Sequence, residues 1–187
     1  MGLVKCFDQD VFVSYGWMDD EALKGGERNW IEGFSVNLQK RLSQITGNRA
    51  LLWRDMESLG KNEQIWPAIQ RAITRSALFL SVISPRYVKS SSCLRELSHF
   101  ELVRMLWGGP SVNSLMRAFH VIKLPVKQEE MPQLYRSRNG YEFFQRDQMK
   151  GYPLELSPAS DLYRERTNEL AFDMASVLDQ LERRTNA

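Results

Sequence analysis

Glu96 is the residue whose surroundings point most directly to chemistry. It lies in the segment 90–107, where apolar residues recur at helical spacing and Leu97 and Phe100 share one face. At about 100° per residue, Glu96 projects into this apolar stripe, between Phe100 and Val103. Moving a carboxylate from water into such a stripe is unfavourable unless it is paired, reaches solvent or serves a site. Glu96 is therefore a candidate functional residue.

Two ordinary structural roles compete with that interpretation. A capping box requires Ser or Thr three residues before the glutamate, but that position is Cys93, and Ser92 lies four residues before it. The capping box therefore does not fit. A glutamate early in a helix can also interact with the helix dipole, by up to about 1 kcal/mol, while its tip reaches water. The sequence leaves this second role open.

Composition limits the remaining possibilities. The chain has 187 residues, 43% of them hydrophobic and 26% charged, which suits a single domain with its core at about 8–185. A net charge of +2, with acidic and basic residues interspersed, gives no reason to expect direct nucleic-acid binding. Cys6 and Cys93 cannot form the disulfide framework of a secreted domain, so a reducing, cytoplasmic location is expected. The longest apolar run, 77–83, is too short to span a membrane.

The pattern alternates between strands and helices. Runs of β-branched, aromatic or continuous apolar residues predict strands at 10–15, 50–53, 77–83 and 119–124, with a weaker one at 141–144. Helical patterns run from Trp30 to Leu42 with Gly47 as the stop, from Ile65 to Ile73, through Glu96, and from a cap at Asp161 to Leu181. Pro153 and Pro158 are expected to exclude regular structure from their segment.

This alternation predicts an α/β fold with a parallel central sheet covered by helices on both faces. Ligands of such sheets bind beyond the carboxyl ends of the strands. The loops after Tyr15, Trp53 and Ser84 should therefore meet at one edge, and the last of them leads into the helix of Glu96. The loop after the second strand lacks the Gly-Lys-Ser/Thr of a phosphate-binding P-loop, since its lysine is followed by Asn62.

Three motifs resemble those of the TIR domain family, and the resemblance runs from about residue 10 to the last helix. The first is the opening strand Asp-Val-Phe-Val-Ser-Tyr at 10–15. The second is Trp53-x-Asp55-x-x-x-Leu59, similar to the start of the family's BB loop between second strand and second helix. The third is the serine-aromatic pair within 84–87 followed by Cys-Leu-Arg-Glu-Leu at 93–97, similar to the signature of NAD-cleaving TIR domains. The resemblance implies a flavodoxin-like three-layer fold with about five parallel strands.

The resemblance also implies an activity. Glu96 would be the catalytic carboxylate that cleaves the nicotinamide–ribose bond of NAD, which is the substrate, so that no cofactor and no metal are expected. One carboxylate can suffice, because nicotinamide leaves as a neutral base and the developing charge lies on the ribose. His99 and His120 are given no catalytic role. The substrate-binding residues would be Tyr15, Gly16, Trp17, Trp53, Asp55, Leu59 and Ser92.

Two positions depart from the family pattern. The glycine expected three residues after Leu59 is Asn62, although Gly60 is near and asparagine tolerates positive φ. The tryptophan expected four residues before the glutamate is Ser92, so one aromatic stacking surface is missing. The shape of the loop and the aromatic residue that replaces this tryptophan therefore stay open.

The expected partners are other TIR copies, which would contact one another through the loop 54–63. The last helix has no Gly or Pro stop near Ala187, so the chain is expected to be the effector module of a longer protein with a sensor domain. The similarity is greatest to bacterial anti-phage effectors. The main alternative is a non-catalytic TIR scaffold that acts through TIR–TIR association, and a second is a related nucleoside-cleaving enzyme.

Overall fold

The computed structural model describes residues 2–21, 29–54, 65–106 and 115–186. Its main sheet has five parallel strands in the order β2-β1-β3-β4-β5. The strands are β1 (Gln9–Tyr15), β2 (Leu52–Arg54), β3 (Ser76–Ile83), β4 (Ala118–Ile122) and β5 (Tyr141–Glu142). This order changes direction between β1 and β3, which is where flavodoxin-like sheets bind their ligands. The predicted α/β fold is confirmed.

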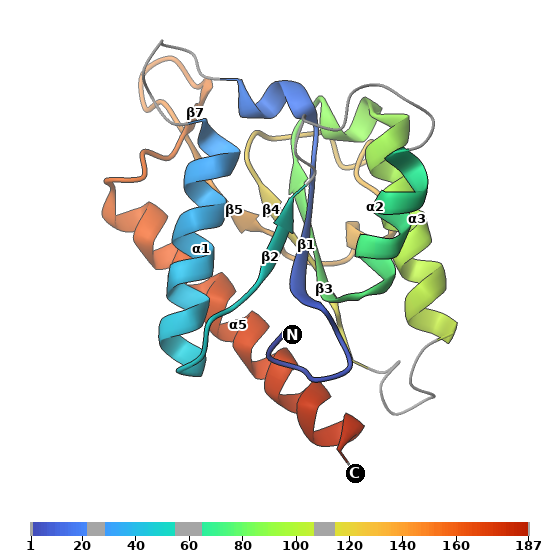
Figure 1. Cartoon of the computed structure of the whole chain (residues 1–187). Helices are drawn as coiled ribbons and strands as arrows, with labels where there is room; N and C mark the ends of the chain where they lie inside the picture. The colour runs from blue at the N-terminus through green and yellow to red at the C-terminus, as the bar shows by residue number, and fades with distance from the viewer. Residues whose placement is uncertain (1, 22–28, 55–64, 107–114, 187) are drawn as a thin grey trace.

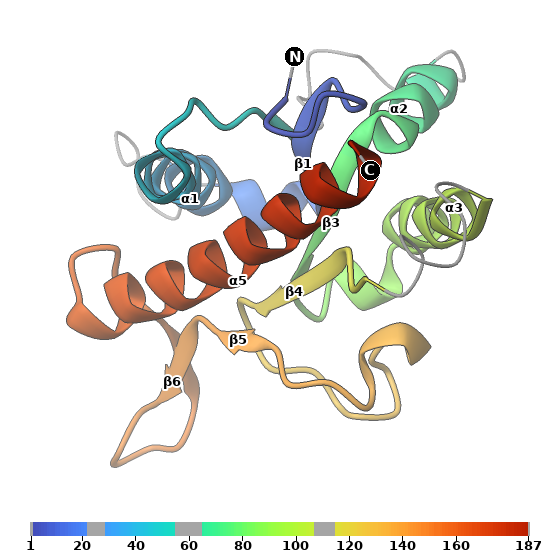
Figure 2. The same cartoon turned by 90° about the horizontal axis from the view of Figure 1, so that it is seen from below.

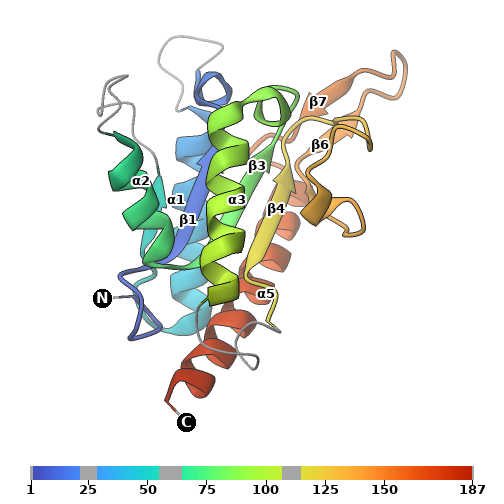
Figure 3. The same cartoon turned by 90° about the vertical axis from the view of Figure 1, so that its right-hand side faces the viewer.

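Helices cover both faces of the sheet. α1 (Trp30–Thr46) and α5 (Asp161–Thr185) pack on one face, and α2 (Ile65–Thr74) and α3 (Ser91–Leu106) on the other (Figures 1 and 3). Viewed from below, the sheet lies between these two pairs (Figure 2). Both termini lie at the lower end in Figure 1, and the carboxyl ends of the strands point to the upper end.

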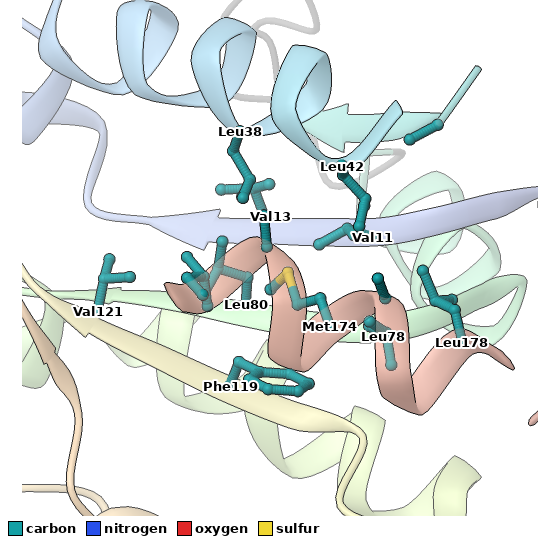
Figure 4. Close-up of a cluster of buried hydrophobic side chains, with 14 of the residues drawn as sticks. Val11, Val13, Leu38, Leu42, Leu78, Leu80, Phe119, Val121, Met174 and Leu178 are labelled. Atoms are coloured by element: carbon teal, nitrogen blue, oxygen red, sulfur yellow. The ribbon is translucent and has the colours of Figure 1, made fainter. Parts of the chain in front are cut away.

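The larger part of the core lies between the sheet and the pair α1 and α5. Alternate residues of the central strands face this side, among them Val11, Val13, Leu78 and Leu80, all fully buried. Leu38 of α1 and Met174 of α5 cover them (Figure 4). α1 stops where the sequence predicted, because Gly47 takes a left-handed φ of 69°.

The other face uses the intervening residues of the same strands. Phe12, Phe79 and Ile83 pack against Leu97 and Phe100 of α3. All eight residues of β3 are buried, as expected of a strand covered on both faces.

Three short elements complete the carboxyl end of the sheet. They are the 3₁₀ helices η1 (Trp17–Asp20) and η2 (Tyr87–Lys89), which follow β1 and β3, and η3 (Gln133–Tyr135), which follows β4. Among the helices of the described ranges, none combines the length and the apolar character needed to cross a bilayer.

Two sequence predictions about the last third of the chain are wrong. Pro153 does not exclude regular structure, because it begins β7 (Pro153–Glu155), which pairs with β6 (Phe144–Arg146) as a two-stranded antiparallel sheet. Proline is tolerated there because it is the first residue of a strand in a two-stranded ribbon. Asp161 is not the cap of α5, since Ser160 accepts a hydrogen bond from the N–H of Tyr163 and Asp161 is the first helical residue.

Candidate active site

Glu96 lies on the second turn of α3, against the carboxyl end of the sheet. Only 5% of its surface is exposed. Its Oε2 accepts a hydrogen bond of 2.6 Å from the Oγ of Ser14, the last residue but one of β1. A glutamate whose tip reaches water at the rim, the role that the sequence left open, is therefore not what the structure shows. This carboxylate is buried and held by a neighbouring strand.

The first turn of α3 is tied to the end of β1 by a second contact. The Sγ of Cys93 donates to the backbone carbonyl of Tyr15 over 3.3 Å. Burial, followed by the charge of nearby Glu96, raises the pKa of Cys93 to about 12. The thiol is therefore protonated at neutral pH and can donate this hydrogen bond. The bond attaches the first turn of α3 to the end of β1, next to Glu96.

A second polar contact joins the loops after β1 and β3. The Ser84 Oγ donates to the Oδ2 of Asp19 over 2.5 Å, and the Ser84 Oγ itself accepts from the backbone N–H groups of Arg86 and Tyr87. Burial raises the pKa of Asp19, while the Ser84 hydrogen bond and the charge of Lys123 act in the opposite direction. A second carboxyl group, partly buried, is thereby held at this end of the sheet.

Gly16 makes the close approach of these loops possible. A Cβ at this position would lie 2.9 Å from the Oδ2 of Asp19 and 3.0 Å from the Cγ of Arg86. A side chain at this position would force the side chains of Asp19 and Arg86 to shift. The side chain of Trp17, the next residue, is 51% exposed.

The remaining sequence-predicted site residues fall in three kinds of position. Tyr15 is half-buried at the end of β1, and Ser92 is exposed on the first turn of α3. Trp53 on β2 stacks on Phe12 with 4.7 Å between the ring centroids, so part of its surface is committed to packing. Asp55 and Leu59 lie outside the described residues, as does most of the loop 54–63.

Four polar residues at this end of the sheet were not among the predicted site residues: Ser14, Asp19, Ser84 and Tyr87. A signal for Ser14 was present, since this polar residue directly follows the apolar run 11–13 of the same strand. Ser84 and Tyr87 form the serine-aromatic pair of the third motif, but their contacts with Asp19 and Ser14 could not be predicted, because these partners lie on elements far apart in the chain.

Within the described residues, His99 and His120 contact other groups, and neither histidine forms a hydrogen bond with Glu96. His99 Nε2 lies 3.3 Å from the Thr74 hydroxyl, and its ring meets Trp66 edge-on. His120 is buried and stacks on Tyr135, with 4.3 Å between the centroids. Within the described residues, no group of three or more His, Cys, Asp and Glu is arranged to hold a metal ion.

Comparison with known proteins identifies this architecture. The family model described as TIR domain matches residues 11–150. The structure is similar to the TIR domains in the structure of the activated Roq1 resistosome directly recognizing the pathogen effector XopQ, with 14% sequence identity and a TM-score of 0.42. That likeness covers 94% of this chain and 84% of the other. A search of curated proteins gave no match.

Proposed function

The chain belongs to the TIR domain family, and from that premise we propose that it is an NAD glycohydrolase, an enzyme that cleaves the nicotinamide–ribose bond of NAD. The observation that carries the proposal is the burial of Glu96 at the carboxyl end of the sheet, 2.6 Å from the Ser14 hydroxyl. Burying a carboxylate is unfavourable, and a scaffold has no evident use for one at this edge.

The proposed chemistry asks little of the protein beyond this group. The nicotinamide ring of NAD is cationic and leaves the ribose as a neutral base. The leaving group therefore needs no general acid. Positive charge then develops on the ribose, and a carboxylate in a poorly solvated site stabilises it strongly. Glu96 would face this charge, and it can bond covalently to the sugar, as the nucleophile of retaining glycosidases does.

The substrate-binding residues proposed from the sequence would surround this carboxylate. Tyr15 is the last residue of β1, Gly16 and Trp17 follow it directly, and Ser92 lies one helical turn before Glu96. The exposed ring of Trp17 offers a stacking surface where Ser92 replaces the tryptophan of the family pattern. Trp53, Asp55 and Leu59 remain proposals for the same role from the second strand and its loop.

The decisive experiment is Glu96→Gln, which keeps the size of the side chain and removes its charge. NAD turnover should fall at least about a hundredfold, the usual loss when one such transition-state contact is removed. Glu101→Gln on the same helix is the matched control and should keep wild-type turnover. Product analysis by mass spectrometry would distinguish linear from cyclic ADP-ribose. Unchanged turnover in a folded Glu96→Gln protein would sink the assignment.

Activity is further proposed to require several copies of the domain, with the loop 54–63 at the contact. Trp17 and Met18 are 51% and 44% exposed on η1, which follows the carboxyl end of β1. A neighbouring copy there would cover this apolar surface and exclude water from the reacting ribose. The specific activity should then rise with protein concentration, and Leu59→Ala should lower it. A demonstrably monomeric protein with constant specific activity would rule out assembly but not the enzyme.

Within a cell, this activity fits the effector module of an immune or cell-death response such as anti-phage defence, joined to a sensor domain and located in the cytoplasm. The alternative is a TIR scaffold without chemistry. Concentrated, assembled protein that leaves NAD intact would favour the scaffold over the enzyme.

A further inference from the structure

Behind the Glu96 contact, a chain of buried hydroxyl groups runs across the sheet. The Oγ of Ser14 lies 3.4 Å from the hydroxyl of Tyr87, which is 2.9 Å from the Oγ of Ser81. Ser81 is also 2.9 Å from the hydroxyl of Tyr135. The Tyr135 hydroxyl in turn reaches the backbone carbonyl of Phe119 over 3.3 Å. Four hydroxyl groups thus connect the carboxylate with the backbone of β4.

The fold brings these groups together from four separate elements. Ser14 of β1 and Ser81 of β3 are partners in the parallel register, and both face the α2 and α3 side of the sheet. Tyr87 comes from η2 and Tyr135 from η3, and both rings are almost completely buried. Burial raises the pKa of both tyrosines, so they remain neutral hydroxyl groups at any physiological pH.

Counting protons gives the chain a direction at its Glu96 end. A hydroxyl has one proton and two acceptor positions, whereas an ionised carboxylate only accepts. The 2.6 Å contact with Glu96 therefore takes the proton of Ser14. The 3.4 Å contact between the Ser14 Oγ and the Tyr87 hydroxyl has the geometry of a bond that Ser14 would donate. Ser14 has only one proton, and the contact of 2.6 Å with the carboxylate is much the shorter, so Glu96 receives that proton and Tyr87 packs against the serine oxygen.

Building on the proposed function, we propose that Ser14 is a positioning residue for Glu96, to which it donates a buried hydrogen bond of 2.6 Å, and that the Tyr87 hydroxyl of the buried chain packs behind it. Ser14 itself would not touch NAD. Its hydrogen bond favours the ionised form of the buried carboxylate and restricts it to one direction. Without it, Glu96 would meet the ribose less often in the charged, correctly oriented state.

The test compares Ser14→Ala with a matched variant, Ser76→Ala. Ser76 is also a buried serine of the sheet, but it lies at the other end of β3 and donates to the backbone carbonyl of Ala72 over 2.7 Å. Tyr87→Phe is the second test, because it leaves Ser14 in place and removes the next member of the chain. Each protein is assayed for NAD turnover across pH, and the Glu96 side chain is titrated by ¹³C NMR, with Glu96→Gln to assign its signal.

Ser14→Ala should lower kcat about tenfold with KM changed less than about twofold, because one charge-assisted hydrogen bond is lost. The titration midpoint of Glu96 and the acidic limb of the rate profile should both move to higher pH, by about one unit. Tyr87→Phe and Ser76→Ala both keep the Ser14 donor of Glu96, so neither variant should move the midpoint or the rate profile to higher pH.

A Glu96 midpoint and a rate profile that are the same in Ser14→Ala as in Ser76→Ala would overturn the proposal. The titration needs no substrate, so it also separates this inference from the proposed function. A wild-type protein that cleaves no NAD would refute the function, whereas the midpoint of Glu96 in Ser14→Ala would still decide whether Ser14 controls that carboxylate.

Discussion

Lys123 and Glu155 form an ion pair of 2.7 Å between Nζ and Oε1, which joins the residue after β4 to strand β7. The two side chains are only 7% and 29% exposed. The ammonium also lies 5.6 Å from the ring centroid of Trp30, the first residue of α1. One lysine therefore connects the β6–β7 hairpin, the carboxyl end of β4 in the main sheet and α1.

Glu155→Gln should destabilise the domain, because it leaves the shielded ammonium of Lys123 without an opposite charge. A loss of about 1–3 kcal/mol in the free energy of unfolding is expected, measured by urea denaturation. Asp179→Asn is the control, since it removes the ion pair with Arg183, whose side chains are 58% and 77% exposed. Pairs of that kind contribute about 0–1 kcal/mol. Equal losses in the two variants would contradict the importance of burial here.

The two cysteines should differ sharply in reactivity. Cys6 is exposed, whereas Cys93 is buried with its pKa raised to about 12. Because the thiolate is the reactive form, Ellman's reagent at pH 8 should find one thiol in the native protein and two after denaturation. Cys6→Ser should leave the native protein without a reactive thiol. A native Cys6→Ser protein that reacts promptly would show that the first turn of α3 opens away from Tyr15.

Much of the fold was predictable because its elements are locally encoded. The apolar run 77–83 indicated a strand covered on both faces, and the structure shows β3 with all eight residues buried. Glu96 stood out for the same reason, since a charge within an apolar helical stripe conflicts with its surroundings. Its placement beside the end of β1 follows from the parallel topology.

The polar connections of the site could not be predicted, because they depend on tertiary packing. Ser14 and Glu96 are 82 positions apart, and Ser14 and Tyr87 are 73 apart. Ser81 interrupts the apolar run 77–83, but no local rule indicates that its hydroxyl meets that of Tyr135. Pro153 led to the wrong prediction that its segment has no regular structure. The local rule against proline in strands does not hold for the first residue of an edge strand.

Two glycine-to-alanine changes should have opposite effects on stability. A Cβ at Gly140 would lie 2.5 Å from His120 Nε2 and 3.1 Å from the Cγ1 of Ile122, so Gly140→Ala should destabilise by about 1–3 kcal/mol. Gly33 lies within α1 with nothing inside 4 Å of the added Cβ, so Gly33→Ala should stabilise by about 0.5–1 kcal/mol. Urea denaturation measures both changes. A Gly140→Ala protein as stable as wild type would show that the segment before β5 can shift away from His120.

His120 should make the domain less stable in mild acid. Burial, followed by the positive charge of Arg138, lowers the pKa of His120 from 6.5 to about 4 in the folded protein. Between these two values the unfolded chain binds a proton that the native state does not, so stability falls as the pH drops from about 6.5 to about 4. The expected loss between pH 7 and pH 5 is about 2 kcal/mol, measured by urea denaturation at both values. His120→Leu removes this contribution and leaves all other titrating groups in place, so it should lose about 2 kcal/mol less over the same interval. Identical losses in the variant and the wild type would mean that His120 titrates in the folded protein as it does in the unfolded chain.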